Sequence, residues 1–382
     1  MAITGIICEY NPFHLGHYKQ ISTQKTKNPQ DGIVCLMSGN YVQRGMPAIF
    51  DKVVRAQTAL VCGADLVLEL PVTAALSSAE GFAAEGVRIL GNFCDSLSFG
   101  AECSDSTLLL EAAETLLRPD FSEKLKEYLA EGLSFPAARQ KALEYFSIDG
   151  ALVASPNNIL AIEYCKAILS QKSKMKLDPI LRQGNYHDLT PDAENPSATS
   201  LRRLIENGED WRPFVPNGVG SLFENATVHT LAAGEKAILY RLRTMTDEDF
   251  EALPYGSEGL WRKLMKNARK YASLEQILTA TKSKRYTRTR LDRMVMCAYL
   301  GLTEQDLSSP APYARVLALN DTGREILLKA RETGHFPNIG EKIDHPYQEI
   351  ETRCDDLYGL FANDTIEAPG LAEKRRIIYV NT

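Results

Sequence analysis

The sequence predicts an α/β protein, with a doubly wound parallel sheet followed by a mainly helical C-terminal region. Two observations carry this prediction. In the first half, short runs rich in Ile, Val and Leu alternate with helical patterns, as strands buried on both faces alternate with their connecting helices. After the stretch 211–220, which holds two prolines and two glycines, strand-like runs become rare and helical runs dominate. We therefore expect two domains, 1–215 and 216–382.

The expected elements follow in chain order. Apolar runs predict strands at 2–10, 32–39, 65–71, 96–102 and 176–183. Helical patterns between them predict helices at about 16–27, 50–62, 77–91, 104–117, 121–131, 135–146 and 156–171. The helices within about 104–175 form an insertion before the last of these strands. Beyond residue 220 we expect helices at about 235–243, 247–252, 257–269, 273–281, 286–300 and 322–332, and a terminal strand at 375–381.

Composition bounds the class of protein. The chain has 382 residues, of which 44% are hydrophobic and 24% are charged, and this is typical of globular proteins. No apolar run approaches the roughly 20 residues that a membrane helix needs, and "MAITGIICEY" has no signal-peptide pattern. The eight cysteines form no CxxC pair, which favours free thiols in a reducing compartment over a zinc site. We therefore expect a cytoplasmic protein with no membrane partner.

The most informative short stretch is "EYNPFHLGHYKQI", which joins the first strand to the first helix. Ligands of open α/β sheets bind at the carboxyl ends of strands, and helix N-termini attract anions. His14 and His17 can donate to a phosphate oxygen there, while Pro12 ends the strand and Gly16 lets a ligand approach the backbone. A pair of capping histidines at a turn is the alternative. The strand–turn–helix context favours a phosphate site.

The run "NPFHLGH" resembles the HxGH signature of the nucleotidyltransferase superfamily, which binds ATP and lets an oxygen attack its α-phosphate. That superfamily carries a second signature, SSTxxR, near its last strand. Here "PSATSLRRLI" at 196–205 supplies Ser197, Thr199 and Arg202, with Ala198 in place of the second serine. The resemblance implies a Rossmann-like, HUP-type nucleotidyltransferase domain. The catalytic residues that we expect are His14, His17, Thr199 and Arg202.

Further stretches narrow the resemblance. They are "CEYNPFH", "MSGNYVQRGMPAIFDKVVRA", "GADLVLELP", "SPNNILAIEY" and "KRYTRTRLDRM". Together they resemble the bacterial tRNA(Met) cytidine acetate ligase family. The resemblance implies that ATP activates acetate to acetyl-adenylate, and that the acetyl group passes to N4 of the wobble cytidine of elongator tRNA(Met). The partners are then acetate and this tRNA.

The same resemblance implies a set of ATP-binding residues. They are Ile7, Cys8, Glu9, Tyr10, Asn11, Pro12, Phe13, His14, Gly16, His17, Lys19, Gln20, Gly100, Asn157 or Asn158, and Arg182. Simpler interpretations stay open, because Gly100 can be a strand-end turn, "SPNN" a helix cap, and Arg182 a solvated strand end. ATP usually arrives with Mg²⁺, although the sequence shows no dedicated carboxylate cluster for a metal.

Two other features bear on the acceptor. In the loop after the second strand, Asn40, Gln43 and Arg44 can face acetate or the flipped cytidine, or form an ordinary surface loop. From 261 to 293, eleven Lys and Arg residues face only two acidic ones, in a chain whose net charge is -6. Such a basic stripe suits a phosphate backbone, and a solvated helical face is the alternative. The tRNA-binding residues that we expect are Arg262, Lys263, Lys266, Arg269, Lys270, Lys284, Arg285, Tyr286, Arg288 and Arg290, with Tyr286 as a stacking surface.

Two competing functions remain at this point. One is an adenylyltransferase for a small phosphorylated acceptor without RNA, and the other is an RNA-binding protein with a vestigial nucleotide fold. The basic stripe and the lack of a GxFDP start count against the first. The intact His14, Gly16, His17, Thr199 and Arg202 count against the second.

Overall fold

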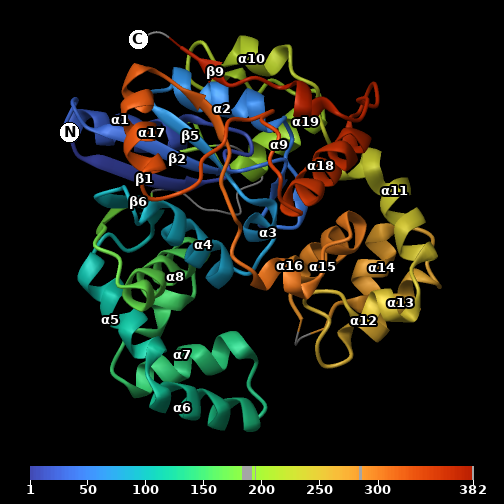
Figure 1. The fold of residues 1–382 in the computed structure, drawn as a ribbon. Coiled ribbons are helices and arrows are strands. Elements are labelled where there is room, and N and C mark those ends of the chain that lie inside the picture. Colours follow the sequence, from blue (N-terminus) through green and yellow to red (C-terminus); the bar gives the residue numbers. More distant parts are fainter. Residues whose placement is uncertain (183–191, 194, 284–285, 381–382) are drawn as a thin grey trace.

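The computed structural model describes residues 1–182, 192–193, 195–283 and 286–380. A seven-stranded sheet forms its centre, in the order β7-β6-β1-β2-β5-β8-β9 (Figure 1). The strands are β1 (Ile3–Cys8), β2 (Gly32–Ser38), β5 (Leu66–Leu70), β6 (Ser96–Ala101), β7 (Lys176–Leu181), β8 (Val316–Leu319) and β9 (Ile378–Tyr379). The first five of them are parallel, as the sequence predicts, and the α/β fold class is confirmed.

Side chains alternate between the two faces of this sheet. On β2, Val34 and Leu36 enter one apolar core with α4 (Ala79–Leu90) and α8 (Pro156–Gln171). Ile33, Cys35 and Met37 enter the other core, with α1 (Leu15–Lys27) and α2 (Lys52–Val61). Because both faces are covered, these strands are apolar along their whole length. The carboxyl ends of β1, β2 and β6 lie at the same end of the sheet, because these strands are parallel.

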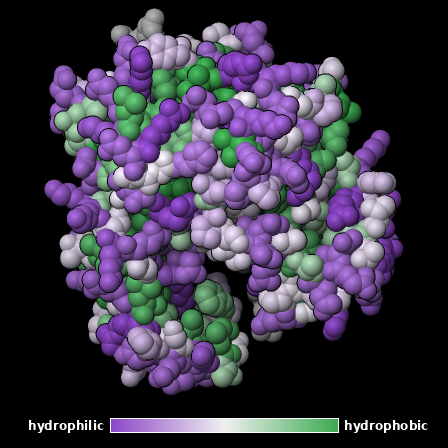
Figure 2. Space-filling view, viewed as in Figure 1, coloured by the Kyte–Doolittle hydropathy of each residue, from purple (hydrophilic) through white to green (hydrophobic). Residues whose placement is uncertain are grey.

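The helical insertion lies between β6 and β7, as expected. It comprises α5 (Ser106–Leu117), α6 (Pro119–Ala130), α7 (Phe135–Tyr145), η1 (Gly150–Val153) and α8. Helices α6 and α7 form a pair that projects away from the sheet (Figure 1). The space-filling view shows a largely hydrophilic face, hollowed between this pair and the C-terminal helices (Figure 2).

The C-terminal helices build an apolar core of their own. The main ones are α11 (Leu231–Thr244), α12 (Asp247–Glu251), α13 (Leu260–Ala268), α14 (Leu274–Thr281) and α15 (Arg288–Leu300). Helix α18 (Tyr347–Tyr358) closes this core and also contacts the sheet domain. The remaining elements are α9 (Ala198–Glu206), η2 (Arg212–Phe214), α10 (Gly220–Glu224), α16 (Glu304–Ser308), α17 (Asp321–Arg331), η3 (Gly359–Phe361) and α19 (Leu371–Lys374), besides the short α3 (Val72–Ala75) and the hairpin β3 (Tyr41–Val42) and β4 (Met46–Pro47). None of the helices in the described parts of the chain is both long and apolar enough to cross a bilayer.

The sheet is larger than the sequence predicts. Strand β8 pairs with β5 in antiparallel orientation, and β9 pairs with β8, so the chain returns to the sheet after the C-terminal helices. The stretch at 211–220 is packed rather than extended, and the adjoining Phe223 stacks on Phe50 with ring centroids 4.5 Å apart. The domain boundary at 215 stays a prediction, and the sheet draws strands from both sides of it.

Candidate nucleotide site

The two histidines form a paired cap at the start of α1. The Nδ1 atom of His14 accepts a hydrogen bond from the Gly16 amide at 3.1 Å, and Nδ1 of His17 accepts from the His14 amide at 3.3 Å. Their rings stack with centroids 3.7 Å apart. Because each Nδ1 accepts, the proton of each neutral ring lies on Nε2. Both histidines can therefore cap the helix through Nδ1 and still offer an N–H donor at Nε2. Helix capping and phosphate binding, given above as alternatives, are compatible.

Burial keeps these rings neutral. Burial, together with the nearby charges of Arg182 and Arg202, lowers the pKa of His14 to about 3. Burial also holds the pKa of His17 well below its usual value, with contributions from His14 and Arg182. The Nε2 atom of His14 is buried and has no hydrogen-bond partner among the described residues. A buried donor of this kind in a positive field fits an anionic ligand oxygen.

The structure gives a different reason for Gly16 from the one predicted. A Cβ at this position would lie 3.0 Å from Cε1 and 3.1 Å from Nδ1 of His14. A side chain at this position would therefore crowd the neighbouring imidazole ring, and the role of Gly16 in ligand approach stays a prediction.

The second signature meets the first. Ser197 caps α9 by accepting from the Ser200 amide at 3.1 Å. Arg202 then donates from Nη1 to the carbonyl oxygen of Asn11 at 2.6 Å and from Nη2 to Oγ1 of Thr199 at 3.1 Å. The guanidinium therefore lies against the HxGH segment, as expected from two signatures of one site.

The carboxyl end of β6 contributes the third side of the site. A Cβ built on Gly100 would meet no atom within 4 Å, so the space beside this backbone is open. Glu102, which the sequence analysis missed, organises the start of α8. Its carboxylate accepts from Oγ of Ser155 at 2.7 Å, from Nδ2 of Asn157 at 2.6 Å and from the Asn158 amide at 2.9 Å.

These contacts distinguish the two asparagines. Asn158 is 5% exposed, and its Oδ1 accepts from the Cys103 amide at 2.9 Å. Oδ1 of Asn157 instead accepts from Nη1 of Arg182 at 3.2 Å. Asn158 therefore holds the strand end in place, whereas Asn157 lies beside an arginine that also acts on His14.

The segment after β2 is fixed by the residues that precede the histidines. Oε1 of Glu9 accepts from the Gln43 amide at 2.7 Å, and Oδ1 of Asn11 accepts from the Ile49 amide at 2.8 Å. The unusual Glu and Asn of this signature thus anchor the β3–β4 hairpin. Arg55, which is fully buried, donates to the carbonyl oxygen of Glu9 at 2.6 Å from the other side.

Asn40 is held by hydrogen bonds within the protein. It is 3% exposed; its Oδ1 accepts from the Lys52 amide at 2.8 Å, and its Nδ2 donates to Asp355 at 3.0 Å. Nζ of Lys52 lies 2.8 Å from Asp355 and 2.8 Å from Glu69. Although burial opposes its charge, these carboxylates keep the pKa of Lys52 above its usual value.

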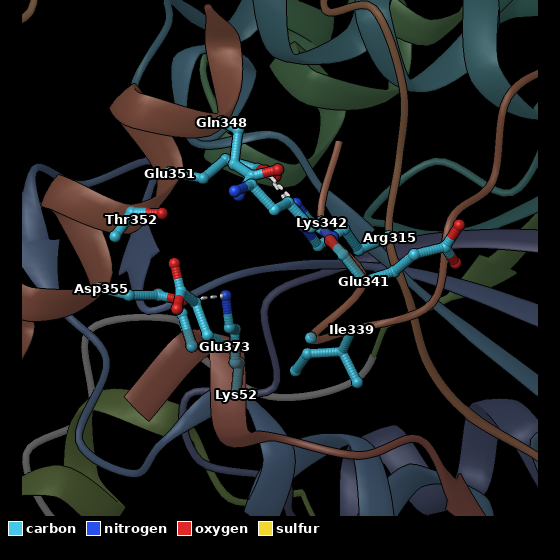
Figure 3. A pocket seen from close by; sticks show the side chains of 12 residues that line it. Lys52, Arg315, Ile339, Glu341, Lys342, Gln348, Glu351, Thr352, Asp355 and Glu373 are labelled. Atoms are coloured by element: carbon cyan, nitrogen blue, oxygen red, sulfur yellow. Dashed lines mark hydrogen bonds and ion pairs between the residues drawn. The ribbon is translucent and has the colours of Figure 1, made fainter. Parts of the chain in front are cut away.

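A cavity of about 210 Å³ lies beside this cluster, between α2, α18 and α19 (Figure 3). Arg315 on its wall pairs with Glu351 at 3.0 Å, as Lys52 pairs with Asp355. The buried charges of the cavity therefore pair with one another. They identify an ion cluster that ties α18 to α2.

The basic stripe divides into exposed and internal residues. Arg288 pairs with Glu275 and Asp292, each at 2.7 Å, and Arg290 donates to the carbonyl oxygen of Tyr255 at 2.8 Å. Tyr286 is 8% exposed within the helical core, so the prediction that it offers a stacking surface is wrong. Lys284 and Arg285 lie outside the described residues. Of the predicted tRNA-binding residues, Arg262, Lys263, Lys266, Arg269 and Lys270 are exposed, and Arg269 pairs with Asp247 at 2.7 Å.

The chain is similar along its length to proteins of one name. A tRNA(Met) cytidine acetate ligase of Clostridium perfringens is 37% identical over 392 residues, which cover 96% of this chain and 97% of that protein. A ligase of the same name from Acetivibrio thermocellus is 35% identical, and the alignment covers 100% of both proteins. This chain belongs to the tRNA(Met) cytidine acetate ligase family.

A family model and two solved structures support the same assignment. The family model described as HIGH nucleotidyl transferase matches residues 1–371. The apo crystal structure of Thermotoga maritima TmcAL superposes with a TM-score of 0.91 at 28% identity, over 100% of both chains. The structure of the same protein bound with alpha-thio ATP gives a TM-score of 0.88, also at 28% identity and full coverage. The predicted family and nucleotidyltransferase fold are confirmed.

Proposed function

We propose that this chain uses ATP to convert acetate to acetyl-adenylate and then transfers the acetyl group to N4 of the wobble cytidine of elongator tRNA(Met). The observation that carries the proposal is the meeting of the two signatures in a chain of this family. Arg202 contacts the backbone of Asn11 beside the buried, unpartnered Nε2 of His14. We place the reaction in the cytoplasm, where the tRNA acceptor is found.

The first step needs positioning and charge neutralisation rather than a covalent nucleophile. An acetate oxygen forms a bond to the α-phosphorus, and the bond to the bridging oxygen breaks as pyrophosphate leaves. In this proposal, Nε2–H of His14 and of His17 donate to phosphate oxygens, because both rings are neutral and carry the proton there. Arg202, oriented by Thr199, neutralises the departing phosphates.

The nucleoside lies on the β6 side of the site. The HxGH segment over 7–20, the open backbone of Gly100, and the Asn157–Arg182 pair are its proposed contacts. Mg²⁺ is expected to arrive with ATP. Among the residues that the structure describes, no group of three or more His, Cys, Asp or Glu side chains converges to hold a metal ion.

In the second step, the cytidine N4 attacks the acyl carbon and loses a proton, while AMP leaves. The acetyl group is already activated, so orientation of the base supplies much of the catalysis. The exposed cations of 262–270 are the proposed contacts to tRNA phosphates, because Arg288 and Arg290 are half-buried and are held by carboxylates and a backbone carbonyl.

One incubation tests the overall reaction. The protein is mixed with ATP, labelled acetate and bulk bacterial tRNA, and the RNA is digested to nucleosides. Labelled N4-acetylcytidine is the expected product. An adenylylated small molecule without labelled RNA would instead indicate an adenylyltransferase, and tRNA binding without either product would indicate a non-enzymatic RNA-binding protein.

The tRNA surface has its own test. The double substitution Arg262→Glu and Lys266→Glu should raise the KM for tRNA about tenfold or more, because each lost phosphate contact weakens binding. Acetate-dependent ATP–pyrophosphate exchange should be unchanged. The matched control reverses the exposed Lys126 and Lys174, which lie in the insertion. Equal KM values for tRNA in both double variants would contradict the assignment.

A further inference from the structure

Ser38 is the last residue of β2, and its hydroxyl has no protein partner. The residue is fully buried, and Oγ makes no hydrogen bond to any residue that the structure describes. A buried hydroxyl without a partner is costly and requires an explanation. His14 Nε2, which we assign to phosphate, is in the same condition at the neighbouring strand end.

The strand register places Ser38 at the candidate site. Cys8, the last residue of β1, is paired with Met37 of β2, so Glu9, which follows β1, comes opposite Ser38. Nη1 of Arg55 confirms this neighbourhood, because it donates to the carbonyl oxygen of Glu9 at 2.6 Å and to that of Ser38 at 3.0 Å. Ser38 therefore adjoins the segment that leads into His14.

The surroundings suit a small apolar acid. On the other side of β2, Ser38 is paired with Leu70, which belongs to an apolar core with Ala74 and Ala75 at the start of the following segment. Paired residues of adjacent strands point to the same face, so apolar side chains lie on the β5 side of the hydroxyl, while Glu9 lies on the β1 side. Such a wall fits a methyl group, while the hydroxyl supplies one donor for a carboxylate.

Charges of both signs lie at this strand end, because the buried Arg55 is accompanied there by the carboxylates of Glu9 and Glu69. Arg55 is fully buried, and its guanidinium donates hydrogen bonds to the carbonyl oxygens of Phe50, Glu9, Ser38 and Gly39. The carboxylate of Glu9 accepts from the Gln43 amide, so one anion already lies near it. Arg55 is thus a buried cation beside Ser38, and the carboxylates of Glu9 and Asp51 interact with its charge.

We propose that the hydroxyl of Ser38 binds the carboxylate of acetate, in a small subsite at the carboxyl end of β2 that Leu70 walls on its apolar side. The inference rests on the proposed function. It assigns a binding site to acetate, for which the sequence signatures identify no pocket. Because β1 lies between β6 and β2, the nucleoside and the acid flank the phosphate-binding histidines from opposite sides. That arrangement lets an acetate oxygen approach the α-phosphorus without crossing the nucleoside.

Kinetics of acetate-dependent ATP–pyrophosphate exchange without tRNA test this subsite. Ser38→Ala should raise the KM for acetate about tenfold or more, because it removes a hydrogen bond to a charged group, and should leave the KM for ATP within about twofold. Ser38→Cys, which keeps the shape with a weaker donor, should fall between. The control is Ser96→Ala at the amino-terminal end of β6, where Oγ contacts Oγ1 of Thr4 at 3.0 Å. Both KM values should stay at the wild-type level there.

The failing outcomes are distinct. An unchanged KM for acetate in Ser38→Ala, with wild-type exchange intact, overturns the subsite and leaves the proposed function standing. A rise in the KM for ATP alone shows that the hydroxyl binds nucleotide instead. Absence of acetate-dependent exchange in the wild-type protein overturns both proposals. If Ser38→Ala does not fold, as thermal melting will show, an unchanged KM for acetate in Ser38→Cys overturns the subsite.

Discussion

The ring of His14 makes two contacts of different kinds, and two substitutions separate them. Its Nδ1 accepts from the Gly16 amide and caps α1, while its Nε2 has no described partner and is assigned to phosphate. His14→Ala removes both groups. His14→Asn removes the Nε2 donor but offers Oδ1 as a cap acceptor, and asparagine is among the best N-cap residues.

The expected magnitudes follow from these contacts. Loss of a donor aimed at developing charge typically lowers the rate by about 10²–10³, so both variants should lose that much acetate-dependent exchange. Loss of an N-cap costs about 1 kcal/mol, which His14→Ala should show and His14→Asn should largely avoid. The two variants should therefore share an activity defect and differ in the free energy of unfolding.

The assays are pyrophosphate exchange at saturating acetate and urea unfolding at pH 7. His229→Asn is the control, because His229 is buried outside the site and stacks on Tyr358 with ring centroids 4.0 Å apart. It should retain wild-type exchange. The reasoning is refuted if His14→Asn keeps more than a third of the wild-type rate, since the donor would then be idle. It is equally refuted if both His14 variants unfold at the same urea concentration.

Two further predictions concern acid stability and the hairpin. Since the pKa of His14 is about 3 when folded and about 6.5 when unfolded, the unfolded state binds the proton as pH falls through 6.5. Between pH 7 and 5, urea unfolding should show that wild type loses about 2 kcal/mol more stability than His14→Asn, and parallel losses would contradict this. Gly45 has a φ of 78°, and a Cβ there would lie 2.3 Å from the backbone nitrogen of Arg293. Gly45→Ala should therefore lower the melting temperature and raise the KM for tRNA more than that for ATP; unchanged melting would show that the contact is not strained.

The sequence predicted those parts of the fold that depend on neighbours in the chain. The first five strands are apolar runs bounded by polar residues, and their positions are confirmed. Strand β8 was missed because its four residues, "VLAL", carry no local signal that distinguishes a strand from a helical turn. Its partner is β5, about 250 residues earlier, and pairing over such a separation is not encoded in the local pattern.

The same difference between local and distant contacts explains which site residues the sequence predicted. The histidines and Arg202 were found because short signatures contain them, whereas Arg55 and Asp355 were missed. Arg55 acts on backbone carbonyls of four different residues, and Asp355 pairs with Lys52 from the far end of the chain. Tyr286 was misassigned because the charges around it dominate the local composition, although its own side chain turns into the helical core. Charge counts therefore find a basic surface without separating its exposed face from its buried one.

The β3–β4 hairpin joins the nucleotide site to the basic helices by direct contact. Glu9 holds the Gln43 amide, and the Gln43 carbonyl accepts from Nη1 of Arg293 on α15 at 3.2 Å. Gly45 packs against the backbone of the same helix. Substitutions on this inner face of α15 must therefore disturb both steps of the reaction, because they move a segment that Glu9 shares with the nucleotide site. If the exposed cations bind tRNA as proposed, substitutions at positions such as Lys266 should change only the KM for tRNA. The inner and outer faces of the helical region are therefore expected to differ in how many steps of the reaction a substitution affects.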